Sequence, residues 1–476
     1  MMKIPLPKII QGGMGVGVSH WRLAQAVSRL GQLGVVSGTG LDQVLARRLQ
    51  DGDAGGDVRR ALSHFPFPHM AQRVLDALFV PGGKPAARPY QAATRHTLKS
   101  NRWVDELCMV SNFVEVFLAR EGHTNPVGIN YLEKIQLPHL PSAYGAMLAG
   151  VAVVIVGAGI PVEFPGVLDA LSRHEAATYS VRVSGATPAT DCRRVFDPAQ
   201  YIEEGCALPV LNRPDFLPII SSDSLATMLL RRASGSVEGF VIEGPTAGGH
   251  NAPPRGPLRL SGDGQPVYGP RDVVNLESMR AIGHPFWLGG EYGSPEALVL
   301  ASEKGAAGVQ VGTAFALCEE SGMLPEMRRA LIAEVFAGRA RVYTDRLASP
   351  TGFPFKVARL EGTLSEPEVY AARRRVCDLG YLRETYVKPD GTIGYRCPAE
   401  PVEAYTAKGG SAEDTVGRKC ICNGLFGNIG LGQVRADGTR EPGIVTLGDD
   451  YLRIGRFCTP DRPDYPASHV VRVLMG

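Results

Sequence analysis

The feature that most constrains this sequence is a unit that recurs along its first 340 residues. Each unit has a short apolar run, a turn that contains glycine, and a segment with helical periodicity. Runs that are apolar on both faces and alternate with helices predict a parallel sheet covered by helices. The candidate strands are residues 8–11, 33–37, 126–131, 151–156, 177–183, 217–220, 239–243, 286–288 and 308–311.

We predict an α/β fold, a (β/α)₈ TIM barrel. Such a barrel uses eight strands, and nine candidates are present. The surplus candidate is 177–183, because a segment containing proline and cysteine follows it before residue 217. A Rossmann-type sheet is the main alternative. It is disfavoured because Gly13-x-Gly15-x-Gly17 does not match Gly-x-Gly-x-x-Gly, and no acidic residue ends a second strand.

Two regions exceed a minimal barrel and set the expected domain organisation. Residues 1–340 would form the barrel, with a helical insertion at about 50–125 after the second strand. The repeating unit stops near residue 341, and residues 341–476 are punctuated by proline and glycine. We expect this tail to be a C-terminal cap that shapes the site or forms a homodimer contact.

Composition and charge exclude several classes of protein. Basic and acidic side chains nearly cancel, leaving a net charge of +2, and no run of five Lys or Arg occurs. We therefore expect no nucleic-acid partner and no membrane surface. The uncharged stretch 135–162 is cut by prolines and glycines into pieces shorter than the ~20 residues of a membrane span. An odd number of cysteines, nine, and the lack of a signal-peptide pattern predict a cytoplasmic protein.

The strongest local signal is residues 239–250, a buried strand followed by a turn of small residues that presents His250. Consecutive glycines allow backbone N–H groups to approach an anion closely. A histidine at the C-terminal end of a barrel strand lies where such enzymes place catalytic groups. The alternative interpretation is a turn whose histidine is merely exposed.

Two later turns strengthen the functional interpretation. The strand at 286–288 ends in Gly289-Gly290, and the strand at 308–311 continues into Gly312-Thr313 and a predicted helix at 314–320. These are the last two strand-to-helix turns of the repeat, where barrels hold phosphate groups. Near the N-terminus, Ser19 is predicted to cap the first helix.

The ordered set of motifs resembles the nitronate monooxygenases, formerly called 2-nitropropane dioxygenases. The resemblance covers about residues 5–335 apart from the insertion. The same superfamily of FMN-dependent barrel oxidoreductases contains flavin-dependent enoyl-acyl-carrier-protein reductases. The motifs are Ile9-Ile-Gln-x-x-Met14, Val127-Gly-Ile-Asn130, Ala247-Gly-Gly-His250, Gly289-Gly290 and Gly308-Val-Gln-Val-Gly-Thr313.

The resemblance implies a role for each matched residue. His250 would be the catalytic base or a hydrogen-bond donor beside the flavin. Met14 would lie near the isoalloxazine ring, Asn130 would contact the flavin, and Glu243 would lie near the flavin. The residues that would line the cofactor or hold the FMN phosphate are Gly248, Gly249, Gly289, Gly290, Gln310, Gly312 and Thr313.

Three departures from the family pattern qualify these roles. Gly12-Gly13 stands where the family usually has Ala-Pro, and Glu243 stands where many members have glutamine. A carboxylate at that position would alter the flavin potential. A polar segment stiffened by proline, residues 251–255, follows His250.

The tail contains four cysteines whose spacing lacks the paired Cys-x-x-Cys of common zinc sites. We therefore assign no metal ligand, and favour buried or unpaired thiols over a zinc site. Cys108 and Cys318 fall in helical patterns and are interpreted as core residues. The four tail cysteines are Cys377, Cys397, Cys420 and Cys422.

Three hypotheses for function follow from these residues and the resemblance. The first is an FMN-dependent enzyme that oxidises a nitroalkane or alkyl nitronate with O₂ to a carbonyl compound and nitrite. The second is an NAD(P)H-dependent enoyl-thioester reductase of fatty-acid or polyketide synthesis, with an acyl-carrier protein as its partner. The third is a non-catalytic flavin-binding protein. The first two act on small-molecule substrates, and the sequence does not choose between the electron donors.

Overall fold

The computed structural model describes residues 2–476 and contains one eight-stranded parallel barrel. Its strands follow the order β1-β11-β10-β9-β8-β4-β3-β2, and a parallel bridge between Ile10 and Leu33 closes β2 onto β1. The predicted (β/α)₈ barrel is therefore confirmed. The barrel strands are β1 (Ile9–Gln11), β2 (Gly34–Ser37), β3 (Val127–Leu132), β4 (Val153–Gly157), β8 (Asp215–Ile220), β9 (Phe240–Glu243), β10 (Phe286–Gly289) and β11 (Gly308–Val311).

Successive side chains along each strand point to opposite faces of the sheet, and both faces are buried, which explains why the strands are apolar throughout. One set of side chains fills the barrel interior, including Val35, Ile155 and Trp287. The intervening residues, such as Phe240 and Val154, pack outward into the larger core beneath the helices. The indole N–H of Trp287 donates to the carbonyl of Pro7 at 2.8 Å, so the buried ring leaves no unpaired donor.

The surplus candidate strand lies outside the barrel, as predicted. Its first part forms β5 (Ala177–Ser180), which pairs antiparallel with β7 (Arg193–Phe196). The next residues form the short strand β6 (Val183–Ser184), which joins the hairpin of β14 (Glu384–Val387) and β15 (Ile393–Arg396) from the tail.

Between β2 and β3 the chain forms four helices, α2 (Leu41–Gln50), α3 (Asp57–Leu62), α4 (Pro68–Leu78) and α5 (Arg102–Arg120). The long helix α5 packs against α6 (His139–Leu148), α2 and α1 (Trp21–Arg29). The segment 79–101, between α4 and α5, has no helix or strand.

The other helices follow their strands around the barrel. They are α7 (Phe164–Ser172), α8 (Asp223–Arg232), α9 (Leu276–Ile282), α10 (Pro295–Glu303), α11 (Thr313–Ala316) and α12 (Pro325–Phe336).

Two predicted helix boundaries were wrong. The first helix begins at Trp21, and its cap is the imidazole of His20, not Ser19. The helix predicted at 314–320 ends at Ala316. The chain then turns so that Gly322 donates its N–H to Val18. A Cβ at Gly322 would lie 1.9 Å from the carbonyl oxygen of Gly17, so this tertiary contact overrides helical propensity.

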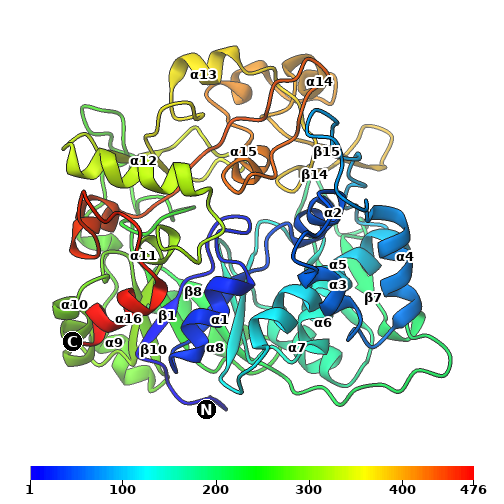
Figure 1. The fold of residues 1–476 in the computed structure, drawn as a ribbon, viewed down its shortest axis with the longest axis horizontal. Helices are drawn as coiled ribbons and strands as arrows, with labels where there is room; N and C mark the ends of the chain where they lie inside the picture. The colour runs from blue at the N-terminus through cyan, green and yellow to red at the C-terminus, as the bar shows by residue number, and fades with distance from the viewer. Residues whose placement is uncertain (1) are drawn as a thin grey trace.

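The tail lies across the C-terminal ends of the strands and then returns to the barrel flank (Figure 1). It contains β12 (Val342–Asp345) paired with β13 (Phe355–Ala358), and the helices α13 (Pro367–Ala372), α14 (Val402–Thr406), α15 (Ile421–Gly427) and α16 (Ala467–Met475). Helix α16 packs against both α1 and α10, and so takes a place in the outer ring of barrel helices. The tail therefore both covers the barrel mouth and supplies part of the barrel's outer layer.

Within residues 2–476, no helix combines the length and the apolar character needed to cross a membrane.

Candidate active site

A cavity of about 190 Å³ opens at the C-terminal ends of the barrel strands. Ten of the eleven predicted site residues line it, so the structure brings together positions up to 299 residues apart in the sequence. They are Met14, Asn130, Glu243, Gly248, Gly249, His250, Gly290, Gln310, Gly312 and Thr313. Gly289 is the exception: it is the last residue of β10, behind the cavity wall.

The first glycine-rich loop, residues 12–17, is held in place by Ser19. The Ser19 hydroxyl donates to the carbonyl of Gly12 at 2.9 Å and accepts the backbone N–H of Met14 at 3.0 Å. A Cβ on Gly13 would lie 2.4 Å from the Cβ of Asn130. The glycine at this departure from the family pattern therefore lets the loop pack directly on β3.

Three other segments, which contain Gly248, Gly290 and Gly448, also approach one another closely through their main chains. A Cβ on Gly248 would lie 3.0 Å from the backbone nitrogen of Gly448, and one on Gly290 would lie 3.0 Å from that of Ala247. Gly290 also has a φ of +87°, which favours glycine. These positions leave main-chain atoms, with no side chains over them, at the cavity surface.

The tail supplies one wall of the same cavity, where the sequence led us to expect a cap that shapes the site but named none of its lining residues. The backbone N–H of Gly448 donates to the Thr313 hydroxyl oxygen at 2.9 Å and joins the tail to the loop after β11. The lining residues from the tail are Phe355, Tyr381, Leu382, Ile421, Cys422, Leu425, Thr446, Leu447, Gly448 and Asp450.

The charged residues of this cavity are all acidic. Glu243, Glu291 and Asp450 line it, and among the described residues no Lys or Arg does. Burial raises the pKa of Asp450, whose carboxylate accepts the backbone N–H of Gly293 at 2.9 Å. An anion here would have to be held by backbone N–H groups, as in loops that bind phosphate through the main chain.

Glu243 ends β9 and faces both the cavity and Gln310. The side-chain amide of Gln310 donates to Glu243 at 2.7 Å. Burial raises the pKa of Glu243 to about 7, against the opposing effect of this hydrogen bond. Near neutral pH the group therefore populates its protonated form, which has the shape and neutrality of a glutamine side chain.

His250 is partly buried at the edge of the cavity. Its Nε2 lies 2.7 Å from the Ser349 hydroxyl, and its ring meets Phe355 edge-on with the centroids 4.9 Å apart. Burial, followed by the charge of Lys134, lowers the pKa of His250 to about 3. The imidazole is therefore neutral at pH 7, in contrast to the expectation of a base that titrates near neutrality.

A second, larger cavity of about 1030 Å³ adjoins the first. Glu243, His250 and Tyr381 line both cavities. Lys134 lines the larger one, and burial lowers its pKa to about 8, so its ammonium group remains mostly charged at pH 7. His250 thus stands where an enclosed pocket meets a space large enough for an extended ligand.

The four tail cysteines are free thiols. Burial raises the pKa of each of them, as expected for unreactive interior groups. Within residues 2–476, metal-ligating atoms converge elsewhere, on Asp42, His96 and Cys108.

No protein-family model matches the sequence, and no curated protein matches it. Among solved structures, FabK from Thermotoga maritima is 15% identical with a TM-score of 0.46, over 98% of this chain and 91% of that one. Nitroalkane oxidase from Streptomyces ansochromogenes is 16% identical with a TM-score of 0.45, over 98% and 94%. The enoyl reductase domain of MlnA from Bacillus amyloliquefaciens is 12% identical with a TM-score of 0.35, over 76% and 65%. None of these likenesses assigns a substrate to this chain.

Proposed function

We propose that this protein is an FMN-dependent oxidoreductase whose cofactor lies in the smaller cavity. The observation that carries the proposal is the convergence of glycine backbones from five loops on one cavity, with His250 at its edge. The last two strand-to-helix turns, at Gly290 and Gly312, contribute to it, and barrels bind phosphate at these turns. Main-chain N–H groups suit the single phosphate of FMN.

The roles proposed for individual residues follow from their places in the cavity. Gly248, Gly290, Gly312 and Thr313 would hold the phosphate, and Met14, Asn130 and Glu243 would border the ring system. A bound flavin supplies the electron transfer. The residues of the chain supply orientation, exclusion of water and control of a proton.

The first candidate substrate is a nitroalkane or its nitronate anion, oxidised with O₂ to a carbonyl compound and nitrite. His250 is neutral at pH 7 and can accept a proton, although the burial and the Lys134 charge that lower its pKa make it a weaker base than a free imidazole. Lys134, which lines the adjoining cavity and acts electrostatically on His250, would attract the negative charge of a nitronate. The two residues together fit a substrate that becomes anionic when it loses its α-proton.

The second candidate is reduction of a 2-enoyl thioester by NADH or NADPH. The larger cavity favours it, because about 1030 Å³ exceeds what a small nitroalkane occupies and suits an extended acyl group. An acyl-carrier protein would then be the partner. His250 would polarise the thioester carbonyl in this reaction.

One experiment tests the cofactor and separates the candidates. The purified protein is analysed for bound flavin, then mixed anaerobically with NADH, NADPH or a nitronate while the flavin absorbance is followed. Bleaching by nitronate alone supports the first candidate, and bleaching by a nicotinamide followed by reoxidation with an enoyl thioester supports the second. A protein that takes up no FMN on reconstitution would refute the proposal. Flavin that no donor reduces would indicate a non-catalytic flavin-binding protein.

A further inference from the structure

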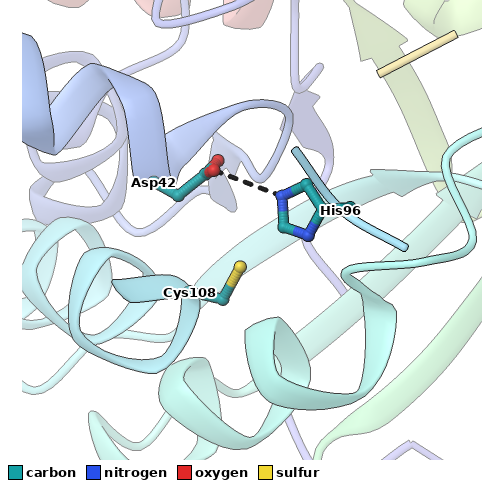
Figure 2. A group of neighbouring side chains, drawn as sticks. All are labelled: Asp42, His96 and Cys108. Atoms are coloured by element: carbon teal, nitrogen blue, oxygen red, sulfur yellow. Dashed lines mark hydrogen bonds and ion pairs between the residues drawn. The ribbon is translucent and has the colours of Figure 1, made fainter. Parts of the chain in front are cut away.

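Three metal-ligating side chains meet in the interior, away from the glycine-rich loops. Asp42, His96 and Cys108 each present one ligand atom, and these atoms lie within 4.8 Å of one another (Figure 2). All three residues are buried, at 5%, 7% and 1% exposure. The Nε2 of His96 is 3.2 Å from Oδ2 of Asp42.

The three residues come from separate parts of the chain. Asp42 lies in the first turn of α2 and Cys108 lies on α5, while His96 lies in the segment 79–101. This segment is 23 residues long and has no helix or strand. Structureless segments of more than about 12–15 residues are uncommon inside compact domains, so an ordered one requires specific attachments.

The spacing and chemistry of the donors fit one divalent ion. Sulfur, imidazole nitrogen and carboxylate oxygen are the ligands of tetrahedral zinc, at about 2.3 Å for sulfur and about 2.0–2.1 Å for the others. Two ligands at about 2.05 Å from a tetrahedral ion are about 3.4 Å apart. The hydrogen bond of 3.2 Å between Nε2 and Oδ2 already holds these two atoms near that separation.

The surroundings supply the remaining requirements of such a site. The Tyr381 hydroxyl donates to Oδ1 of Asp42 at 2.5 Å, which orients the carboxylate and leaves Oδ2 facing His96. A cavity of about 20 Å³, lined by Asp42, Ser142 and Tyr381, lies beside the cluster. That volume holds about one water molecule, which suits a fourth ligand.

Charge bears on the cluster through Asp42. Within residues 2–476, His96 is the only ion-pair partner of the buried Asp42 carboxylate. A divalent cation bound at Oδ2 would compensate the charge of this buried carboxylate.

We propose that Asp42, His96 and Cys108 bind one Zn²⁺ ion, which fastens the segment 79–101 to helices α2 and α5. Because His96 and Tyr381 also line the larger cavity, the ion stabilises part of its wall. The proposal is independent of the proposed flavin chemistry.

The test is zinc content and zinc coordination of the full-length protein. We expect one zinc per chain by elemental analysis after dialysis. X-ray absorption should show one sulfur at about 2.3 Å and nitrogen or oxygen ligands at about 2.0–2.1 Å. Cys108→Ser and His96→Ala should each weaken zinc binding at least 10-fold. Cys318→Ser is the matched control, since its thiol is equally buried and lies outside the cluster, and it should keep the ion.

A second readout concerns the segment itself. Chelation should lower the melting temperature and speed tryptic cleavage after Arg95 and Lys99, and added Zn²⁺ should reverse both effects. Wild-type protein that binds no zinc, or a coordination shell without sulfur, would overturn the proposal. A shell of four sulfurs would also overturn it, because the ion would then lie on the four tail cysteines. The wild-type spectrum decides between these outcomes even if a variant does not fold.

Discussion

The backbone N–H of Gly448 donates a hydrogen bond to the hydroxyl oxygen of Thr313, 2.9 Å away. This bond connects two residues 135 positions apart, one in the tail and one in the loop after the last barrel strand. The tail is therefore part of the candidate cofactor site.

The first prediction is that a truncation ending near residue 340 will be poorly soluble and unable to retain flavin. It removes ten cavity-lining residues and α16, and exposes the apolar surface that both cover. Soluble yield and flavin content measure the effect. A shorter truncation, in which the chain ends at residue 466, removes α16 alone. It should lower the melting temperature and leave the cavity wall in place. A soluble, active chain of 340 residues would show that the tail is an independent accessory.

The second prediction is that Gly312→Leu will abolish flavin retention without unfolding the barrel. The φ of Gly312 is −106°, so a side chain causes no backbone strain there. A Cβ would lie 3.3 Å from the sulfur of Met14, and the rest of the leucine would fill the cavity. Flavin fluorescence after desalting and the far-UV circular dichroism spectrum test the two parts. Gly262→Leu is the matched control, because nothing lies within 4 Å of its Cβ position. Unchanged FMN affinity in Gly312→Leu would mean that the phosphate site is misplaced.

The third prediction concerns Glu243 and pH. Its pKa is raised to about 7 in the folded protein from an ordinary value of 4.5. Between these values the folded state binds more protons than the unfolded state, so this group's contribution to stability falls as pH rises from 4.5 to 7. Glu243→Gln should remove that dependence, and should flatten the melting temperature between pH 5 and pH 8 relative to the wild type. If the melting temperatures of the wild type and of Glu243→Gln changed with pH in parallel, the raised pKa of Glu243 would be refuted.

The fourth prediction uses His250→Asn to separate proton abstraction from flavin binding. The variant should retain FMN, because its proposed phosphate contacts come from other residues. It should lose activity on neutral nitroalkanes by about 10²–10⁴-fold, the usual contribution of a positioned general base. Activity on a nitronate prepared in advance should fall less, since its α-proton is already gone. Equal losses on both substrates would assign His250 to anion binding or electron transfer.

A related pH measurement checks the state of His250 in the wild type. The pKa of about 3 keeps the imidazole neutral down to mildly acid conditions. We therefore expect that any change of kcat/KM on neutral nitroalkanes near pH 6.5–7 comes from Glu243, whose pKa is raised to about 7, and persists in His250→Asn. A protonation step at that pH that disappears in His250→Asn would contradict the lowered pKa.

Local patterns in the sequence were sufficient to predict the barrel, and they named part of the cavity lining. Strand periodicity identified all eight barrel strands, and singled out 177–183 as the surplus. Ten of the eleven named residues line one cavity, because each lies near or just beyond the C-terminal end of a strand and those ends meet at one face.

Long-range contacts account for what the sequence did not predict. Ser19 matches a helix cap, but its hydroxyl is used by Gly12 and Met14. The lowered pKa of His250 depends on burial and on Lys134, 116 residues away. Asp42, His96 and Cys108 have no recognisable spacing, and Cys108 alone is indistinguishable from a core residue. Such groups become visible only when the packing of distant segments is known.

The position of α16 has a consequence for how the protein is made. The strand β1 pairs with β11, and α1 packs against α16, whose residues are 467–475. During synthesis, α1 leaves the ribosome long before residues 467–475, so its outer face stays uncovered until they emerge. We expect the nascent chain to remain partly open until this segment has been translated.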